Sequence, residues 1–209
     1  MNAADYRRVF VVRVHELLAL GYARLPHADY SETDEPSITG FLAQAIRQLF
    51  DDPPPFIDSW CDKYSIADEA PENTEGKTGK DRRRIDIRLE SSERRPRAQF
   101  RFEAKRLTDA NSLSEYFLQG LHRFLISAYA VDDLDAGMLG YVQNPDEQIW
   151  AERLQNRLEE MKAEMRTTDD GAWMHHNQFA GLGFTYRTRH RRQSNDSVIT
   201  IFHMFLRFY

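Results

Sequence analysis

The feature that most limits the fold is a change of hydrophobic period near residue 82. Apolar and charged side chains alternate through residues 82–90 and again through residues 98–105. A period of two residues is typical of β-strands that bury one face. The intervening residues 91–97 include Pro96 and form a turn. The sequence therefore predicts two antiparallel strands joined as a hairpin.

Helical periodicity surrounds this hairpin. The distribution of apolar residues, together with prolines at helix starts, predicts helices at residues 6–20, 36–50, 56–64, 111–130 and 145–165. Gly21 is expected to end the first helix, and Pro36 to open the second. Further strands are expected at residues 138–142, 184–189 and 197–208, and a polar loop at residues 67–81. This order predicts an α/β fold with a mixed central β-sheet flanked by helices.

The composition sets the number of domains and the cellular compartment. The chain has 209 residues, 41% of them hydrophobic, which is enough to bury one core, so we expect a single domain. No apolar run approaches the roughly 20 residues that span a bilayer, and the N-terminus lacks the apolar segment of a signal peptide. The single cysteine, Cys61, rules out an internal disulfide. These features predict a cytoplasmic protein without a membrane partner.

Charge is distributed unevenly along the chain. The net charge of -5 argues against a compact nucleic-acid binder, but two segments are rich in basic residues. Their members are Lys80, Arg82, Arg83, Arg84, Arg88, Arg94, Arg95, Arg97, Arg101, Lys105 and Arg106, and then Arg187, Arg189, Arg191 and Arg192. Both segments could face a phosphate backbone, or they could form a solubilising surface. Both interpretations stay open.

The histidines give weaker signals. His175 and His176 are adjacent in a predicted loop, and we interpret them as exposed rather than as metal ligands. His203 stands within the final aromatic strand, which indicates a histidine at the edge of the core with a local hydrogen bond.

Three charged residues of the hairpin are placed so that they could take part in catalysis. Glu103 and Lys105 are two residues apart, so their side chains project from the same face, and Asp86 lies on the polar side of the neighbouring strand. Two carboxylates on one face repel each other unless a cation lies between them, and oxygen ligands suit Mg²⁺ or Mn²⁺. Lys105 could stabilise developing charge or orient a water molecule. The alternative is a solvated strand face with local ion pairs of little energetic value.

The segments RIDI (84–87) and FRFEAK (100–105) resemble the motif of the PD-(D/E)XK, or restriction-endonuclease-like, nucleases. In that family an acidic residue ends or kinks one strand, and a (D/E)-x-K tripeptide follows in the next. A helix precedes this hairpin and a long helix follows it. Ile85 takes the place of the proline in the family's name. The resemblance covers residues 36–142 and implies a three-layer core, with residues 1–35 as a helical extension and residues 143–209 as a C-terminal helix and strands.

The resemblance also implies a ligand set and a catalytic set. Asp86, Glu103 and the Ala104 backbone carbonyl would hold Mg²⁺ or Mn²⁺, and Lys105 would serve the attacking water. Many members add a glutamate from the preceding helix. Glu35 is the best match for this fourth residue.

Two further expectations concern the flanking helices. Glu32 is the fallback for the glutamate of the preceding helix. After the hairpin, residues 116–124 resemble a run in small bacterial nuclease-like proteins of defence loci, which place a basic or amide side chain near the phosphate. The candidates for contact with nucleic acid are Arg84, Arg88, Arg101, Gln119, His122 and Arg123.

The sequence therefore favours a Mg²⁺-dependent endonuclease that hydrolyses DNA, in anti-phage defence or restriction. The alternative is a catalytically silent or partner-activated subunit of a defence complex on the same fold. A nuclease directed at RNA is a weaker third hypothesis. Cutting both strands together needs two active sites, so a homodimer stays open, as do protein partners from a defence operon.

Overall fold

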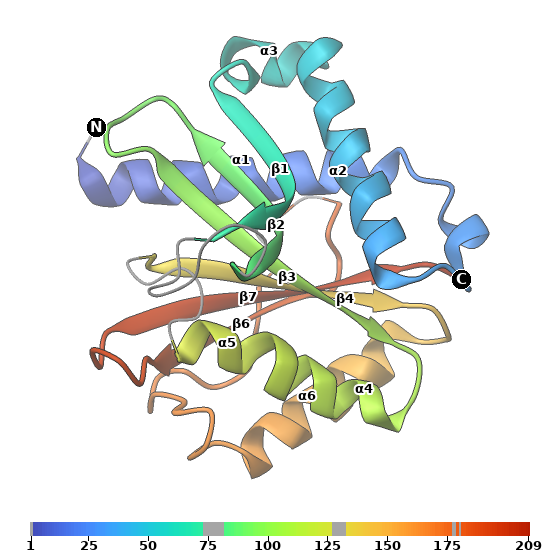
Figure 1. Cartoon of the computed structure of the whole chain (residues 1–209), viewed down its shortest axis with the longest axis vertical. Coiled ribbons are helices and arrows are strands. Elements are labelled where there is room, and N and C mark those ends of the chain that lie inside the picture. Colours follow the sequence, from blue (N-terminus) through green and yellow to red (C-terminus); the bar gives the residue numbers. More distant parts are fainter. Residues whose placement is uncertain (1, 73–81, 127–132, 177–178, 180) are drawn as a thin grey trace.

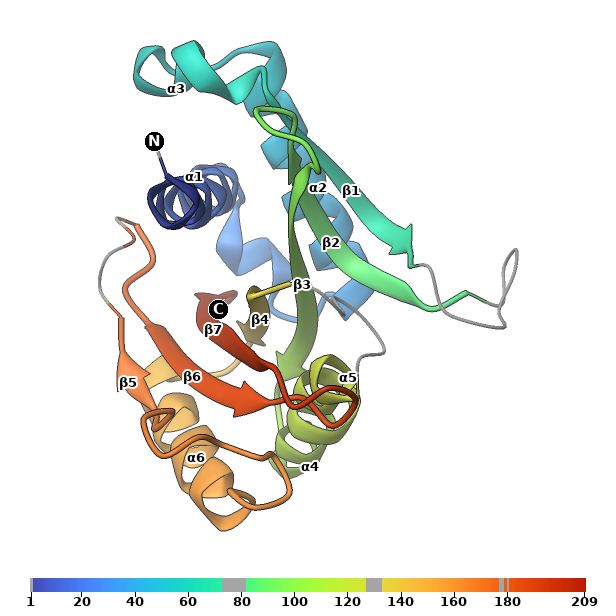
Figure 2. The same ribbon diagram turned by 90° about the vertical axis from the view of Figure 1, so that its left-hand side faces the viewer.

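The computed structural model describes residues 2–72, 82–126, 133–176, 179 and 181–209. These residues form a seven-stranded sheet with helices on both faces, as Figures 1 and 2 show. The strands are β1 (Tyr64–Pro71), β2 (Arg84–Ser91), β3 (Ala98–Leu107), β4 (Asp135–Val142), β5 (Met174–His175), β6 (Thr185–Arg191) and β7 (Val198–Arg207). The helices are α1 (Ala3–Ala23), α2 (Glu35–Asp51), α3 (Pro55–Cys61), α4 (Ala110–Ser114), α5 (His122–Leu125) and α6 (Glu147–Glu160), with a 3-10 turn η1 (His27–Tyr30) and a π-helical segment η3 (Glu115–Leu121).

The sheet mixes both kinds of strand pairing, as the sequence predicted. The strand order is β1-β2-β3-β4-β7-β6-β5. β1, β2 and β3 pair antiparallel, β4 runs parallel to both β3 and β7, and β6 and β5 continue antiparallel to the far edge. The continuous helical segment α4–η3–α5 connects β3 to β4, which is the kind of crossover that a parallel pair requires.

Two apolar cores lie on the two faces of the sheet. On one face, Leu17 of α1 and Ile46 of α2 pack with Phe102 of β3, and all three are fully buried. On the other face, Phe124 of α5 and Leu154 of α6 belong to a second buried cluster. The described chain is thus an α/β structure with helices, sheet and helices in three layers. None of its described helices is long and apolar enough to cross a bilayer.

The central feature of the sheet is a fork between β2 and β3. Their hydrogen-bonded register runs from Ser91 opposite Ala98 to Ile87 opposite Phe102. Beyond this last pair β3 continues with β4 as its partner, and Figure 2 shows β2 diverging from it. The fork opens at Asp86, where β3 loses its neighbour on one side.

The alternation of side chains breaks at the same place. Ile87 belongs to the core beneath α1 and α2, whereas Ile85 belongs to the core beneath α5 and α6. The regular alternation predicted for residues 82–90 would place both isoleucines on one face, and this part of the prediction is wrong. Glu69, in the facing part of β1, has φ 44°, a left-handed conformation that residues other than glycine rarely adopt. The change of direction is therefore shared by both strands.

Several element boundaries differ from the expectation. The predicted loop at residues 67–81 is wrong for its first part, because β1 runs through Pro71, and residues 73–81 lie outside the described residues. Asp, Glu and Pro are depleted in strands, but this is an edge strand, where proline is tolerated. The last α-helix ends at Glu160, earlier than expected. Residues 127–130 of the expected long helix also lie outside the described residues.

Gly21 does not end the first helix, because α1 continues to Ala23. A Cβ added at Gly21 would lie 2.4 Å from Cγ1 of Ile46, so the glycine lets α1 and α2 approach each other. We expect Gly21→Ala to lower the free energy of unfolding by about 1–3 kcal/mol through overpacking. Gly40→Ala is the control, because a Cβ there meets nothing within 4 Å and alanine stabilises a helix by about 0.5–1 kcal/mol. Urea unfolding of both variants measures the difference, and equal effects would contradict this role of Gly21.

Candidate active site

Four residues from three elements meet at the fork. Asp86 lies at the point where β2 turns away, and Glu103 and Lys105 follow on β3. Glu35 is the first residue of α2, whose N-terminus is capped by the Asp34 carboxylate at 2.9 Å from the Ser37 amide. The structure thus brings together all four expected catalytic side chains, although up to 70 residues separate them in sequence.

Lys105 lies at the centre of this cluster. Its Nζ donates to Oε1 of Glu35 at 2.9 Å and to the Ala104 carbonyl at 2.5 Å, and it lies 3.2 Å from Oε1 of Glu103. The residue is only 7% exposed. Burial alone would lower the pKa of Lys105, but the charges of Glu103, Glu35 and Asp86 outweigh burial and raise it. Lys105 is therefore a cation held among carboxylates.

Backbone amides of β3 fix the two outer carboxylates. Oδ2 of Asp86 accepts from the Ala104 amide at 2.6 Å, and Oε2 of Glu35 accepts from the Arg106 amide at 3.1 Å. Burial raises the pKa of both carboxyl groups, and the nearby Lys105 charge opposes that rise. Because β2 has left β3 at this point, these amides are available to side chains instead of to a neighbouring strand.

Glu103 has the most unusual environment of the four. It is 1% exposed, and its Oε1 accepts from Nη1 of Arg123 at 2.6 Å. Its Oε2 is buried without a hydrogen-bond partner. Burial and the neighbouring Asp86 charge raise the pKa of Glu103 from 4.5 to about 7. A buried carboxylate oxygen without a partner costs free energy, which indicates that the site is built for a further ligand.

The donor set fits a hard divalent cation. Three carboxylates (Glu35, Asp86 and Glu103) face two cations, Lys105 and Arg123, so the cluster keeps an excess of negative charge. Carboxylate and carbonyl oxygens are the ligands that Mg²⁺ and Mn²⁺ prefer. In the arrangement described, no group of three or more His, Cys, Asp or Glu side chains is placed to hold a metal among the described residues. The carboxylate oxygens instead accept hydrogen bonds from Lys105 and from backbone amides of β3.

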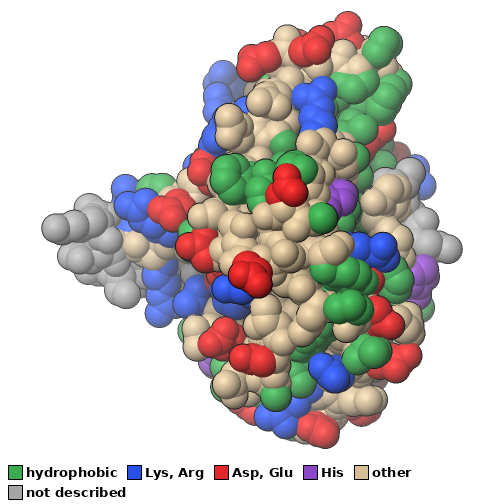
Figure 3. All heavy atoms as spheres, turned by 90° about the vertical axis from the view of Figure 1, so that its right-hand side faces the viewer, with side chains coloured by type: hydrophobic (Ala, Val, Ile, Leu, Met, Phe, Trp, Pro, Cys, Tyr) green, Lys and Arg blue, Asp and Glu red, His purple; other side chains and the backbone are tan. Residues whose placement is uncertain are grey.

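A basic crevice borders the cluster. Arg83 and Arg84 of the β2 end line a cavity of about 430 Å³ together with His122 and Arg123 of α5. Three of these, Arg84, His122 and Arg123, are predicted contacts to nucleic acid. Arg83 is an addition. Figure 3 shows Lys and Arg side chains gathered at one edge of the molecule, beside the residues drawn in grey.

The other predicted contacts to nucleic acid lie elsewhere. Arg88 pairs with Glu90 at 2.9 Å, and Arg101 pairs with Glu72 at 2.9 Å and also with Asp133. Both arginines are absent from the lining of the crevice, and their charges are balanced by these acids. Contact of these two arginines with nucleic acid stays a prediction. Gln119 is exposed on η3 but does not line the crevice, and Glu32 is exposed and takes no part in the described contacts of the cluster.

One further pair of residues belongs to this site but was not predicted from the sequence. Thr39 of α2 and Tyr141 of β4 are both buried, and their hydroxyl groups share a hydrogen bond of 2.9 Å. Burial, together with the charges of Asp86 and Glu35, raises the pKa of the Tyr141 hydroxyl far above the ordinary value. A signal existed, because Thr39 follows Glu35 by four residues and so lies on the same helix face.

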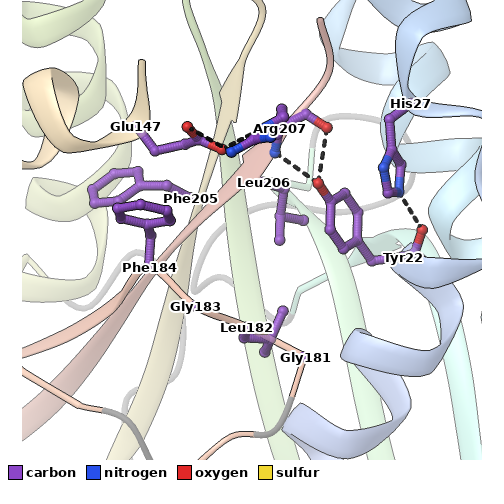
Figure 4. A pocket seen from close by; sticks show the side chains of 10 residues that line it. All are labelled: Tyr22, His27, Glu147, Gly181, Leu182, Gly183, Phe184, Phe205, Leu206 and Arg207. Atoms are coloured by element: carbon purple, nitrogen blue, oxygen red, sulfur yellow. Dashed lines mark hydrogen bonds and ion pairs between the residues drawn. The ribbon is translucent and has the colours of Figure 1, made fainter. Parts of the chain in front are cut away.

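A second cavity, of about 250 Å³, is lined by residues of α1 and β7 and by the loop at residues 181–184 (Figure 4). Its polar groups satisfy one another. Glu147 pairs with Arg207 at 2.6 Å, and the Tyr22 hydroxyl donates to the Arg207 carbonyl at 2.9 Å. This cavity therefore lacks the unpaired polar group that marks the fork.

Comparisons with known proteins add no assignment. A scan against protein-family models, a search of curated proteins and a search of solved structures each returned no match.

Proposed function

We propose that the chain is a metal-dependent nuclease of the PD-(D/E)XK type, which hydrolyses phosphodiester bonds of DNA. The observation that supports the proposal most is the convergence of Asp86, Glu103, Lys105 and Glu35 at the fork, with an orphaned Glu103 oxygen. A solvated strand face does not account for it, because Glu103 is 1% exposed and Lys105 is 7% exposed. Service in bacterial defence or restriction rests on the sequence resemblance alone.

The contacts support a proposed role for each residue. Asp86, Glu103, the Ala104 carbonyl and Glu35 would hold Mg²⁺ or Mn²⁺. When bound, such an ion polarises a phosphoryl oxygen and lowers the pKa of a water molecule. Lys105, which keeps its proton among the carboxylates, orients the attacking water and stabilises the charge that develops on the phosphate. The basic crevice holds the neighbouring phosphates in place.

A second candidate function is a subunit that is silent until a partner activates it. One observation favours it: Lys105 and Arg123 already engage the Glu103 carboxylate. A purified chain that is inert alone and cleaves DNA once a partner from its operon is added would support this candidate.

The test is cleavage of plasmid and linear DNA by the purified chain with Mg²⁺ and with Mn²⁺. We expect EDTA to abolish cleavage, because the carboxylates then lack their cation. Lys105→Ala and Asp86→Ala should each lower the rate by about 10²–10³-fold, as expected when one group that stabilises transition-state charge is removed. Comparing single-stranded DNA, duplex DNA and RNA under the same conditions separates the substrate classes.

Lys162→Ala is the matched control, because Lys162 is an exposed lysine after α6 whose partner is Glu159. It should cleave at the wild-type rate. Activity that survives both Lys105→Ala and Asp86→Ala would show that the cleavage arises elsewhere in the chain or from a contaminant.

A further inference from the structure

Arg123 connects the carboxylate cluster with the basic crevice. Its Nη1 donates to Oε1 of Glu103 at 2.6 Å, and its side chain is 37% exposed, whereas that of Glu103 is 1% exposed. The same arginine lines the crevice beside Arg83, Arg84 and His122. The Arg123 guanidinium therefore contacts a buried carboxylate of the cluster and also borders an open basic surface.

Arg123 and a divalent cation compete for Glu103. Two protein cations already share Oε1 of this residue, namely Arg123 and the Lys105 ammonium at 3.2 Å. A metal ion bound to Glu103 would lie within a few ångström of the Arg123 guanidinium, and like charges at that distance repel strongly in a buried site. Withdrawal of Arg123 would remove this repulsion and leave Lys105 as the remaining cation at Oε1 of Glu103, while Oε2 has no hydrogen-bond partner.

A phosphate in the crevice supplies the reason for withdrawal. Arg83, Arg84 and His122 surround a cavity of about 430 Å³, which is large enough for a phosphate and its attached sugar. Guanidinium groups bind phosphate oxygens with two parallel hydrogen bonds, and these charge-assisted bonds are among the strongest in proteins. An arginine at the border of both sites can exchange a carboxylate for a phosphate by rotating its side chain.

We infer that Arg123 couples the two sites: a nucleic-acid phosphate bound in the crevice draws its guanidinium away from Glu103 and thereby opens the carboxylate cluster to a divalent cation. This inference rests on the proposed function and deepens it, since it makes substrate the condition for metal binding. Linkage requires the reverse as well, so the cation must raise the affinity for nucleic acid by the same factor.

The test measures Mn²⁺ binding by isothermal titration calorimetry, without reference to cleavage. The protein is titrated alone and with a saturating DNA duplex that carries phosphorothioate linkages, whose integrity is checked on a gel. We expect the duplex to raise the Mn²⁺ affinity of the wild type by about tenfold, within the usual range of coupling between sites. Arg123→Gln should bind Mn²⁺ without DNA about as tightly as the wild type does with DNA, and the duplex should add little.

Two further variants separate coupling from DNA binding and from folding. Arg84→Gln also changes the crevice, but Arg84 pairs with Glu69 and not with Glu103. It should weaken DNA binding and leave the Mn²⁺ affinity of the DNA-free protein unchanged. Arg123→Lys keeps a positive charge near Glu103, so its Mn²⁺ affinity without DNA should stay close to the wild-type value.

The outcomes distinguish this inference from the proposed function. Unchanged or weaker Mn²⁺ binding in DNA-free Arg123→Gln, or coupling that persists in that variant, would overturn the role of Arg123 even if the wild type cleaves DNA. A wild type that binds no Mn²⁺ with or without the duplex would overturn the inference and the proposed metal dependence together.

Discussion

Replacing Glu103 by glutamine is expected to abolish DNA cleavage and, at the same time, to make the metal-free chain more stable above pH 7. Glutamine has the same shape and still accepts a hydrogen bond from Arg123. The substitution removes one of the three carboxylates from a cluster that holds two cations. The cleavage rate should fall by about a thousandfold, because charge stabilisation at the reacting phosphate is lost.

The gain in stability follows from the raised pKa of Glu103. Burial and Asp86 raise that pKa from 4.5 in the unfolded chain to about 7 in the folded one. Between these values the folded chain binds more protons than the unfolded chain, so stability falls as pH rises. The wild type therefore loses about 3 kcal/mol between pH 4.5 and pH 7, at about 1.4 kcal/mol for each unit of pKa shift. The Glu103→Gln variant does not lose this stability. The difference in stability between the variant and the wild type is therefore absent below pH 4.5 and complete above pH 7.

Glu147→Gln is the matched control, since Glu147 is also a buried glutamate, with 3% exposure. Burial raises the pKa of Glu147, but the hydrogen bonds and charge of Arg207 and the bond from Tyr209 outweigh burial, and the net shift is downward. Its charge therefore stabilises the fold above the unfolded pKa, and this stability is lost as pH falls. Glu147→Gln should be less stable than the wild type at pH 8.

Urea unfolding at pH 4 and at pH 8 in the presence of EDTA measures both variants. If Glu103→Gln is destabilising at pH 8, Glu103 is a structural ion-pair residue and the site is not held in a costly state for function. A stability gain together with full cleavage activity would equally contradict the role proposed for Glu103.

The sequence was sufficient for the parts of the site that depend on local periodicity. Alternation predicted the hairpin, and it placed Glu103 and Lys105 on one face of β3. Glu35 came instead from the resemblance to the nuclease motif, as the residue just before Pro36 at the start of the preceding helix. The relations within the hairpin involve neighbours within a few residues, where the period of the backbone determines direction.

The fork itself could not be predicted, because its cause is not local. β3 pairs with β4 beyond Phe102, and β1 accommodates the turn of β2 through the left-handed Glu69. Likewise, no pattern near Arg101 shows that it is neutralised by Glu72 and Asp133, which lie 29 and 32 residues away. Which arginines of a basic segment stay available to phosphate depends on such distant partners.

The helix after the hairpin departs from regular α-helical geometry. Its buried residues Ser112, Tyr116, Gly120 and Phe124 repeat every four residues, which is wider than the 3.6 residues of an α-helix turn. The structure has a π-helical segment over Glu115–Leu121, as this spacing indicates. The wider turn keeps one stripe against the sheet up to Arg123, the residue that reaches Glu103.

The second large effect expected is loss of the fold at mildly acidic pH, through three buried histidines. His15, His190 and His203 are all fully buried. Burial lowers the pKa of His15 to about 3 and that of His190 to about 4, and it lowers the pKa of His203 well below 6.5. The expectation that His203 is hydrogen-bonded is confirmed, since it bonds to Tyr116 at 2.9 Å and to Thr188 at 2.8 Å. It lies inside the core rather than at its edge, and its partners are 87 and 15 residues away in sequence.

The sign of this effect is opposite to that of Glu103. Below pH 6.5 the unfolded histidines bind protons while the folded ones do not, so stability falls as pH falls toward 4. Each histidine contributes about 1.4 kcal/mol per pH unit, and three give about 4. The raised pKa values of Glu103, Glu35 and Asp86 offset part of this loss. The histidine contribution is large against the roughly 5–15 kcal/mol that stabilises a domain. Unfolding should therefore begin well above the pH at which most carboxylates titrate.

His15 offers the sharpest test of this assignment. Its Nδ1 bonds to the Val11 carbonyl at 2.7 Å, but its Nε2 is buried without a partner, and its ring stacks on Phe179 with centroids 3.8 Å apart. His15→Leu removes one titrating group and an unsatisfied nitrogen, so it should cut the slope of stability against pH by about 1.4 kcal/mol per unit without lowering stability at pH 8. Leu17→Ala in the same helix should instead lower stability equally at every pH, since no proton is involved. Urea unfolding at half-unit steps from pH 7 to pH 5 measures these slopes, and a flat wild-type curve would mean that the folded chain protonates its buried histidines as readily as the unfolded one.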